Sequence, residues 1–182
     1  MRRILIFSDL DGSLLDATTY SHEDATDALA AIQQRGATLI LVSSKTRAEM
    51  EPLRRGLGNR HSFIVENGGA VYVPNGTFPF PLEQAIPRGA YQILQLGTPY
   101  AHLRTALNDI RQELGDGLRG FGDLTLEEVM QLTGMSAADT RLAMQREYDE
   151  PFVIDGEGIA WQDLRAATDR RGLRCTRGGR FY

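Results

Sequence analysis

The hydrophobic residues in the first half of the chain fall in short runs, separated by stretches with helical spacing. Residues 4–8 and 37–42 are apolar runs without polar alternation, which is typical of buried parallel strands. Between them, residues 25–35 carry apolar side chains at i, i+3, i+4 and i+7 and are followed by a glycine. Residues 46–55 predict a second helix and residues 62–65 a third strand. This alternation predicts an α/β fold with a parallel sheet and right-handed crossovers.

The pattern changes after a short extended piece at residues 70–73. Residues 75–90 are rich in proline and glycine and predict a connector. The remainder predicts an α+β segment with strands at 91–96, 152–154 and 173–176, and helices at 100–114, 125–133, 136–146 and 160–171. Ser21, Thr125 and Ser136 are each followed three residues later by an acid, which predicts helix N-caps.

Polar side chains follow the apolar runs of the first half. Asp9 and Asp11 come after the first run, Ser43 after the second, and Glu66 and Asn67 after the third. Because ligands of open parallel sheets bind beyond the carboxyl ends of the strands, we expect these side chains to line one site.

The segment Asp9-Leu-Asp-Gly has the chemistry of phosphoryl transfer. Two carboxylates leaving a hydrophobic strand are costly to bury unpaired, and oxygen ligands of this kind suit Mg²⁺. One carboxylate can attack phosphorus, and the other can move the proton of the leaving group. Gly12 permits close approach of a phosphoryl group, and Ser43 offers a hydroxyl to it. The alternative reading is an acidic turn, with Asp9 and Ser43 acting as caps.

Composition removes several classes of function. A net charge of −4 and an isoelectric point near 5.4 give no electrostatic footprint for nucleic acid or anionic membrane. The single cysteine, Cys175, excludes an internal disulfide and argues against a zinc cluster. The apolar run at the N-terminus is too short for a signal or membrane segment. We therefore expect a cytoplasmic protein.

The segment Asp9-Leu-Asp-Gly-Ser resembles the first motif of the haloacid dehalogenase (HAD) superfamily, and Ser43 resembles its second. The resemblance implies that Asp9 is the nucleophile and Asp11 the general acid and base. It also implies that Asp9 and the Asp11 backbone carbonyl bind Mg²⁺, and that an α/β cap of the Cof-like branch follows the third strand.

Six further segments together resemble the mannosyl-3-phosphoglycerate phosphatase family over essentially the whole chain: Ser43-Ser-Lys-Thr-Arg, Glu66-Asn-Gly-Gly, Gly97-Thr-Pro-Tyr, Gly120-Phe-Gly-Asp-Leu-Thr, Arg146-Glu-Tyr-Asp-Glu-Pro-Phe and Gly178-Gly-Arg-Phe-Tyr. The resemblance implies hydrolysis of a small sugar phosphoglycerate, mannosyl or glucosyl, with Mg²⁺ as cofactor. We expect residues 1–83 to form the N-terminal part of a HAD-like Rossmannoid core. Residues 84–182 are expected to form an inserted α+β cap.

These segments supply the candidate binding residues beyond the aspartates. An arginine can hold a carboxylate or phosphate with two parallel hydrogen bonds, and paired glycines allow a ligand near the backbone. For each arginine, a solvated or intramolecular pair is an equal alternative. The candidates are Gly12, Ser43, Ser44, Lys45, Asn67, Arg146, Gly178, Gly179 and Arg180.

The family pattern also calls for a lysine and an acidic loop after the last residue of this chain. We expect an open sheet edge beside the first strand, weak Mg²⁺ binding and slow turnover, whether the chain is a fragment, a natural truncation or one part of a complex. Other functions stay open: a phosphatase or mutase for another sugar phosphate, or a catalytically silent sugar-phosphate-binding module. The oligomeric state is undetermined.

Overall fold

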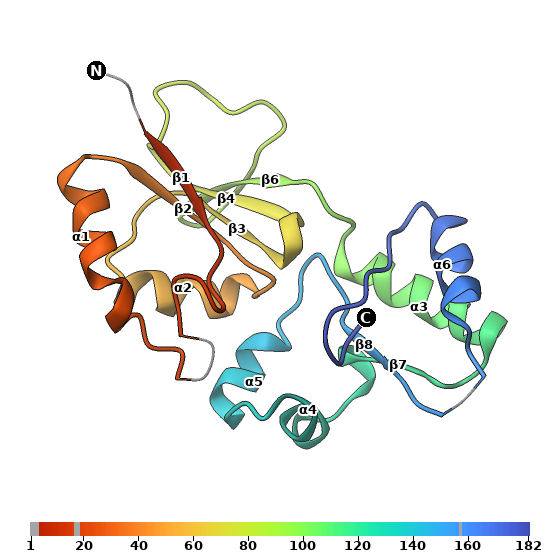
Figure 1. Cartoon of the computed structure of the whole chain (residues 1–182). Coiled ribbons are helices and arrows are strands. Elements are labelled where there is room, and N and C mark those ends of the chain that lie inside the picture. Colours follow the sequence, from red (N-terminus) through yellow and green to blue (C-terminus); the bar gives the residue numbers. More distant parts are fainter. Residues whose placement is uncertain (1–3, 17–18, 157) are drawn as a thin grey trace. The chain divides into compact units, whose positions relative to one another are not determined.

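The chain forms two compact units, Met1–Gly97 and Thr98–Tyr182 (Figure 1). The structure is a computed structural model, and it describes residues 4–16, 19–156 and 158–182. The division at Gly97 lies later in the chain than the expected boundary at residues 83 and 84. The reason is that residues 86–95 contain two strands that pair with the sheet of the first unit.

The first unit is built on a six-stranded sheet with the order β1-β2-β3-β4-β6-β5. Strands β1, β2 and β3 are parallel, and the other three continue the sheet as antiparallel neighbours. The expected α/β class is therefore confirmed, but the sequence did not predict that β5 and β6 would extend this sheet. The strands are β1 (Leu5–Ser8), β2 (Thr38–Val42), β3 (Phe63–Val65), β4 (Ala70–Pro74), β5 (Ile86–Arg88) and β6 (Tyr91–Gln95).

Helices α1 (Thr26–Gln34) and α2 (Arg47–Gly56) connect the parallel strands. Because β1, β2 and β3 follow one another in the sheet, right-handed crossovers put both helices on the same face. A capping box starts α2: Thr46 Oγ1 accepts from Glu49 N, and the Glu49 carboxylate accepts from Thr46 N. The box expected at Ser21 is absent, because a short 3₁₀ turn, Glu23–Ala25, precedes α1.

Strand β1 lies at an edge of the sheet and, within the described ranges, pairs with β2 alone. Leu5 and Phe7 are exposed on it, Phe7 by 60%. This agrees with the expected open edge beside the first strand.

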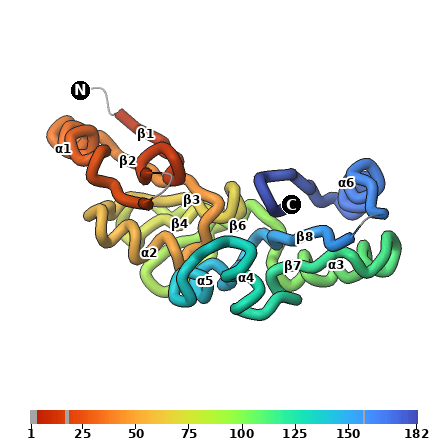
Figure 2. The backbone as a smooth tube through the Cα atoms, turned by 60° about the horizontal axis from the view of Figure 1, so that its bottom comes forward, coloured from red at the N-terminus to blue at the C-terminus, as the bar shows by residue number. Residues whose placement is uncertain are grey.

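The second unit combines helices with a two-stranded antiparallel sheet. In Figure 2, α3 lies beside α6, and α4 lies beside α5. Leu107, Leu118, Phe152 and Leu164 form a core between the first helix pair and the sheet. No helix in the described part of the chain is long and apolar enough to span a bilayer. The elements are α3 (Tyr100–Leu114), β7 (Leu118–Gly120), α4 (Leu126–Thr133), α5 (Ala137–Ala143), β8 (Phe152–Ile154) and α6 (Trp161–Asp169).

Two parts of the second unit differ from expectation. Residues 173–176 form no strand; instead, the backbone of Tyr182 exchanges two hydrogen bonds with Phe152, at 3.0 and 3.2 Å. Strand β7 was not expected. The caps at Thr125 and Ser136 are present, each accepting from the backbone N–H three residues on.

A cluster of charged side chains, the Arg104 cluster, ties α3 to two loops of the second unit. Arg104 binds both oxygens of Asp123 and lies 2.6 Å from Glu150 Oε1. Asp123 also accepts from Gly120 N, and Glu150 from Gly122 N. A Cβ atom at Gly122 would lie 2.6 Å from Arg104 Nε. The glycines of the Gly120-Phe-Gly-Asp segment are therefore needed for this close packing.

Two carboxylates of the Arg104 cluster respond to pH in opposite directions. Hydrogen bonds from Arg104 hold the pKa of Asp123 at about 2, below its ordinary 3.8. Asp123 therefore stabilises the folded unit above about pH 3.8 and loses that effect as the pH falls toward 2. Burial raises the pKa of Glu150 above 4.5. Its contribution is complete below about pH 4.5 and is lost as the pH rises through the raised pKa.

Single amide substitutions should separate these two contributions. The free energy of unfolding of Glu150→Gln, measured relative to that of wild type, should rise as the pH is raised from 4.5 to neutral. The deficit of Asp123→Asn should grow from pH 2 to 4 and then stay constant. Urea unfolding can be followed by the fluorescence of Trp161, the only tryptophan, which lies in the second unit. A pH-independent difference for either variant would contradict the assignment.

Candidate active site

The loop after β1 presents two carboxylates at the carboxyl end of the sheet. Leu10, between Asp9 and Asp11, is fully buried, whereas both aspartates are exposed. The Leu10 carbonyl accepts from Leu15 N at 2.8 Å, and Gly12 N donates to the Leu15 carbonyl at 2.9 Å. Gly12 has a φ of +70°, a left-handed conformation that glycine adopts without strain. The buried leucine thus anchors a tight turn that turns both carboxylates outward.

The turn after β2 lies at the same end of the sheet. Ser43 is 4% exposed, and its hydroxyl accepts from Lys45 N at 3.2 Å. Its backbone oxygen accepts from Asn67 N at 3.2 Å, which joins this turn to the one after β3. Ser44 is exposed next to it. The predicted convergence of these strand ends is therefore present for Ser43 and Asn67.

Lys45 connects this turn to the aspartate loop. Its Nζ lies 2.9 Å from each oxygen of the Asp11 carboxylate. The Lys45 side chain is 17% exposed and that of Asp11 is 41% exposed. The Tyr20 ring lies on the ammonium group, with its centroid 5.3 Å from Nζ. The sequence indicated Lys45 as a cation for the site, but neither its pairing with Asp11 nor its contact with the Tyr20 ring.

The turn after β3 has an unusual backbone. Glu66 and Asn67 have φ values of +49° and +56°, which side-chain-bearing residues rarely adopt. Glu66 N donates to the Lys45 carbonyl at 3.1 Å, and Glu66 is only 2% exposed. The sequence placed Glu66 at this strand end but could not reveal its conformation. Strain of this kind clusters at functional sites.

The site residues fit a magnesium ion that keeps most of its water ligands. No group of three or more acidic, histidine or cysteine side chains suited to a metal occurs in residues 4–16, 19–156 and 158–182. Mg²⁺, however, often binds through one or two carboxylates and keeps several waters. The exposed carboxylate of Asp9 is suited to that mode. The Asp11 side chain is engaged by Lys45, which leaves its backbone carbonyl as the ligand that the resemblance implies.

The candidate residues of the second unit have partners within that unit. Arg146 Nη1 lies 2.9 Å from Asp149 Oδ1, and the guanidinium stacks on Phe121 at 5.5 Å. Gly178 exchanges two hydrogen bonds with Phe181, which closes a tight turn around Gly179 and Arg180.

Arg180 itself donates to the Leu132 carbonyl. The intramolecular alternative considered for both arginines is thus present. A ligand contact for either arginine stays a prediction.

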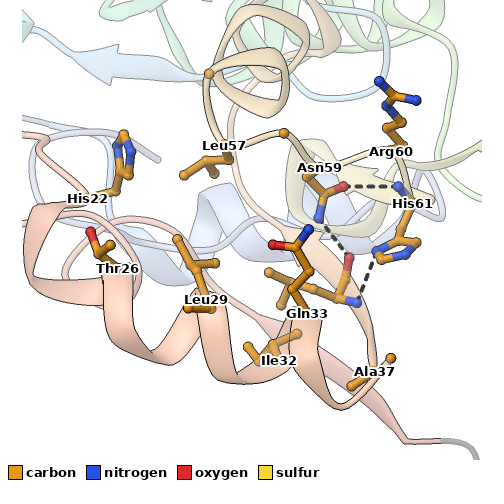
Figure 3. A pocket seen from close by; sticks show the side chains of 15 residues that line it. His22, Thr26, Leu29, Ile32, Gln33, Ala37, Leu57, Asn59, Arg60 and His61 are labelled. Carbon is orange, nitrogen blue, oxygen red and sulfur yellow. Dashed lines mark hydrogen bonds between the residues drawn. The ribbon is translucent and has the colours of Figure 1, made fainter.

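A pocket of about 710 Å³ runs along α1 to the start of β2 (Figure 3). It is bounded by α1 and by the loop after α2. His61 Nδ1 accepts from Leu39 N at 3.2 Å, and Asn59 donates to the Leu39 carbonyl at 3.0 Å. Leu39 is near the start of β2, whereas Ser43 follows its end. This pocket is therefore separate from the candidate active site.

The fold matches that of two solved structures. A Thermoplasma acidophilum protein superposes with a TM-score of 0.64 at 18% identity, covering 100% of this chain and 63% of that one. A sugar phosphatase of HAD subclass IIB superposes with a TM-score of 0.53 at 15% identity, covering 92% and 63%. Residues 6–88 match the haloacid dehalogenase-like hydrolase family. The fold is therefore that of the haloacid dehalogenase-like hydrolases.

Two curated relatives narrow the assignment. The glucosyl-3-phosphoglycerate/mannosyl-3-phosphoglycerate phosphatase of Methanococcoides burtonii is 39% identical over 178 residues, which cover 98% of this chain and 65% of the relative. The mannosyl-3-phosphoglycerate phosphatase of Pyrococcus furiosus is 38% identical over 180 residues, covering 98% and 70%. The chain belongs to the mannosyl-3-phosphoglycerate phosphatase family. It spans 65% to 70% of the length of these relatives.

Proposed function

We propose that this chain acts as a phosphatase on mannosyl-3-phosphoglycerate or its glucosyl analogue, releasing the sugar glycerate and inorganic phosphate. The observation that carries the proposal is the contact of Lys45 with Asp11, at 2.9 Å. It joins the aspartate loop to the Ser43 turn, so two carboxylates, a hydroxyl and a cation share one end of the sheet. The names of the relatives support the choice of substrate. A cytoplasmic location stays a prediction.

The two aspartates divide the chemistry. A carboxylate oxygen of Asp9 attacks phosphorus, and the bond from phosphorus to the glycerate oxygen breaks. Asp11 gives that oxygen a proton and later takes one from the water that attacks the aspartyl-phosphate. The bond from phosphorus to Asp9 then breaks, which frees phosphate and restores both carboxyl groups.

The remaining residues of the first unit would hold the phosphate group. Gly12 allows the close approach of its oxygens, and the hydroxyls of Ser43 and Ser44 can donate to them. Lys45 would neutralise part of the negative charge, and the Asn67 amide would donate to a phosphate or sugar oxygen. Ser43 is already fixed by three hydrogen bonds, so little ordering is required on binding.

Asp9 and the Asp11 carbonyl would hold Mg²⁺. When bound, the ion supplies positive charge that stabilises the phosphoryl oxygens. Weak binding of the ion stays a prediction.

The second unit would act as the cap that selects the substrate. Its candidates for the glycerate carboxylate or the sugar are Arg146, Gly178, Gly179 and Arg180. Since Arg146 pairs with Asp149 and Arg180 with a backbone carbonyl, either must exchange a partner to bind a ligand. The first unit would be the N-terminal part of the catalytic core.

The test is phosphate release by the 182-residue chain with Mg²⁺. We expect release from mannosyl- and glucosyl-3-phosphoglycerate, slower than about 1 per second, and little from a sugar monophosphate without glycerate. A mutase would return an isomeric phosphate instead. Calorimetric binding of substrate without any phosphate release would reject the hydrolase in favour of a silent binding module.

A further inference from the structure

Lys45 is the only lysine among the twenty lysine and arginine residues of the chain. Lysine carries a compact, hydrated point charge on a flexible stem, whereas arginine carries a rigid planar fork. The one lysine ammonium group lies at the candidate active site, within 2.9 Å of both Asp11 oxygens. A flexible stem loses rotamer freedom when it is held in one place. The Asp11 carboxylate is one restraint on the Lys45 side chain, and a second contact would restrain it further.

Tyr20 has the geometry to provide that restraint. Its ring centroid lies 5.3 Å from Lys45 Nζ, within the range of a cation–π interaction. Tyr20 is 56% exposed, so its ring is not held there by burial in the core. Asp11 binds the ammonium through its two oxygens, and an ammonium has three donors. The ring therefore adds attraction without using the remaining donor.

The backbone at Tyr20 has an unfavourable conformation, which accompanies the position of the ring beside Lys45. Its φ of +56° is left-handed, which is unusual for a bulky residue. Tyr20 N donates to the Asp16 carbonyl at 3.0 Å, and Asp16 N donates to the Ser21 carbonyl at 2.8 Å. Conformations of this kind persist only where the surroundings impose them, and they concentrate at functional sites.

We propose that Tyr20 is a positioning residue: its ring holds the Lys45 ammonium in an anion subsite beside Asp11. The nature of the anion, a phosphate group, rests on the proposed function. Because the ring restrains the lysine before the anion arrives, binding costs less conformational entropy. Removal of the ring should weaken anion binding by about two- to fivefold, the usual worth of an exposed cation–π contact.

The single lysine permits a test that does not depend on turnover. A lysine-selective acylating reagent can modify only Lys45 and the N-terminal amine, and mass spectrometry distinguishes the two sites. Inorganic phosphate is the probe: it should slow acylation of Lys45 in the wild type. Tyr20→Asn should raise the phosphate concentration for half protection about two- to fivefold. Asparagine tolerates the left-handed backbone, so this variant removes the ring without adding strain.

Two variants act as controls. Tyr20→Phe keeps the ring and should match wild type. Phe80→Leu removes a ring of similar exposure, 57%, elsewhere in the first unit and should also match it. Melting temperatures of all variants establish that each is folded.

If Tyr20→Asn and wild type needed the same phosphate concentration for half protection of Lys45, the proposal would be overturned. It would also be overturned if phosphate did not protect Lys45 in the wild type. Protection without phosphate release from substrate would keep the subsite and reject only the hydrolase.

Discussion

Asp9→Asn should lower phosphate release from mannosyl-3-phosphoglycerate by about 10³-fold or more, because an amide cannot form the aspartyl-phosphate. The carboxylate is exposed at the end of β1, so its replacement should leave the fold unchanged. Its Oδ1 accepts from Leu10 N at 2.8 Å, and the amide oxygen of asparagine can accept the same bond. The loss should therefore appear in kcat, with little change in thermal stability.

Asp109→Asn is the matched control for that experiment. Asp109 is an exposed aspartate on α3, and the same change there removes one negative charge from the chain. Phosphate release should stay at the wild-type rate. If Asp9→Asn retained the wild-type rate, Asp9 would lose its assigned role and the proposed mechanism would fail. Equal losses in the two variants would indicate an effect of net charge rather than of the nucleophile.

The elements with strong periodicity could be predicted from the sequence. Helix α3 and strand β8 have the predicted bounds, because a long amphipathic pattern and a short apolar run leave little choice. Strands β5 and β7 have three residues each, too few to show alternation, and β5 contains Pro87. Residues 173–176 have strand-like composition, but a strand requires a partner, which sequence periodicity does not reveal.

The sequence predicted which end of the sheet carries the candidate site, but not the contacts within it. The rule for ligands of parallel sheets brings together Ser43 and the aspartates, since each follows a strand. The contact of Lys45 with Asp11 depends on the path of two loops, and the φ of Tyr20 depends on its neighbours. Neither leaves a periodic signal. For Arg146, an intramolecular pair was the general alternative to a ligand contact, and the structure shows that Asp149 is the partner.

Arg104→Met should lower the free energy of unfolding of the second unit by about 3–5 kcal/mol at neutral pH, because it leaves Glu150 charged and buried without its cation. The Glu150 side chain is only 5% exposed, and Arg104 Nη1 lies 2.6 Å from it. The same change frees Asp123 from its main partner. Since the unpaired Glu150 can take up a proton, the loss should be smaller near pH 4.5 than at pH 7.5. Urea unfolding followed by Trp161 fluorescence measures it.

A surface arginine and a double variant make the Arg104 prediction specific. Arg119 bridges Glu128 and Asp155 with 38% of its side chain exposed, so Arg119→Met should cost much less stability than Arg104→Met. Adding Glu150→Gln to Arg104→Met removes the buried charge and should restore part of the lost stability. Equal losses for the two single variants, or no recovery in the double variant, would mean that the buried carboxylate does not govern the stability of this unit. Arg104 and Arg119 each pair with two carboxylates, so the expected difference in stability loss comes from the burial of Glu150 and not from the number of ion pairs.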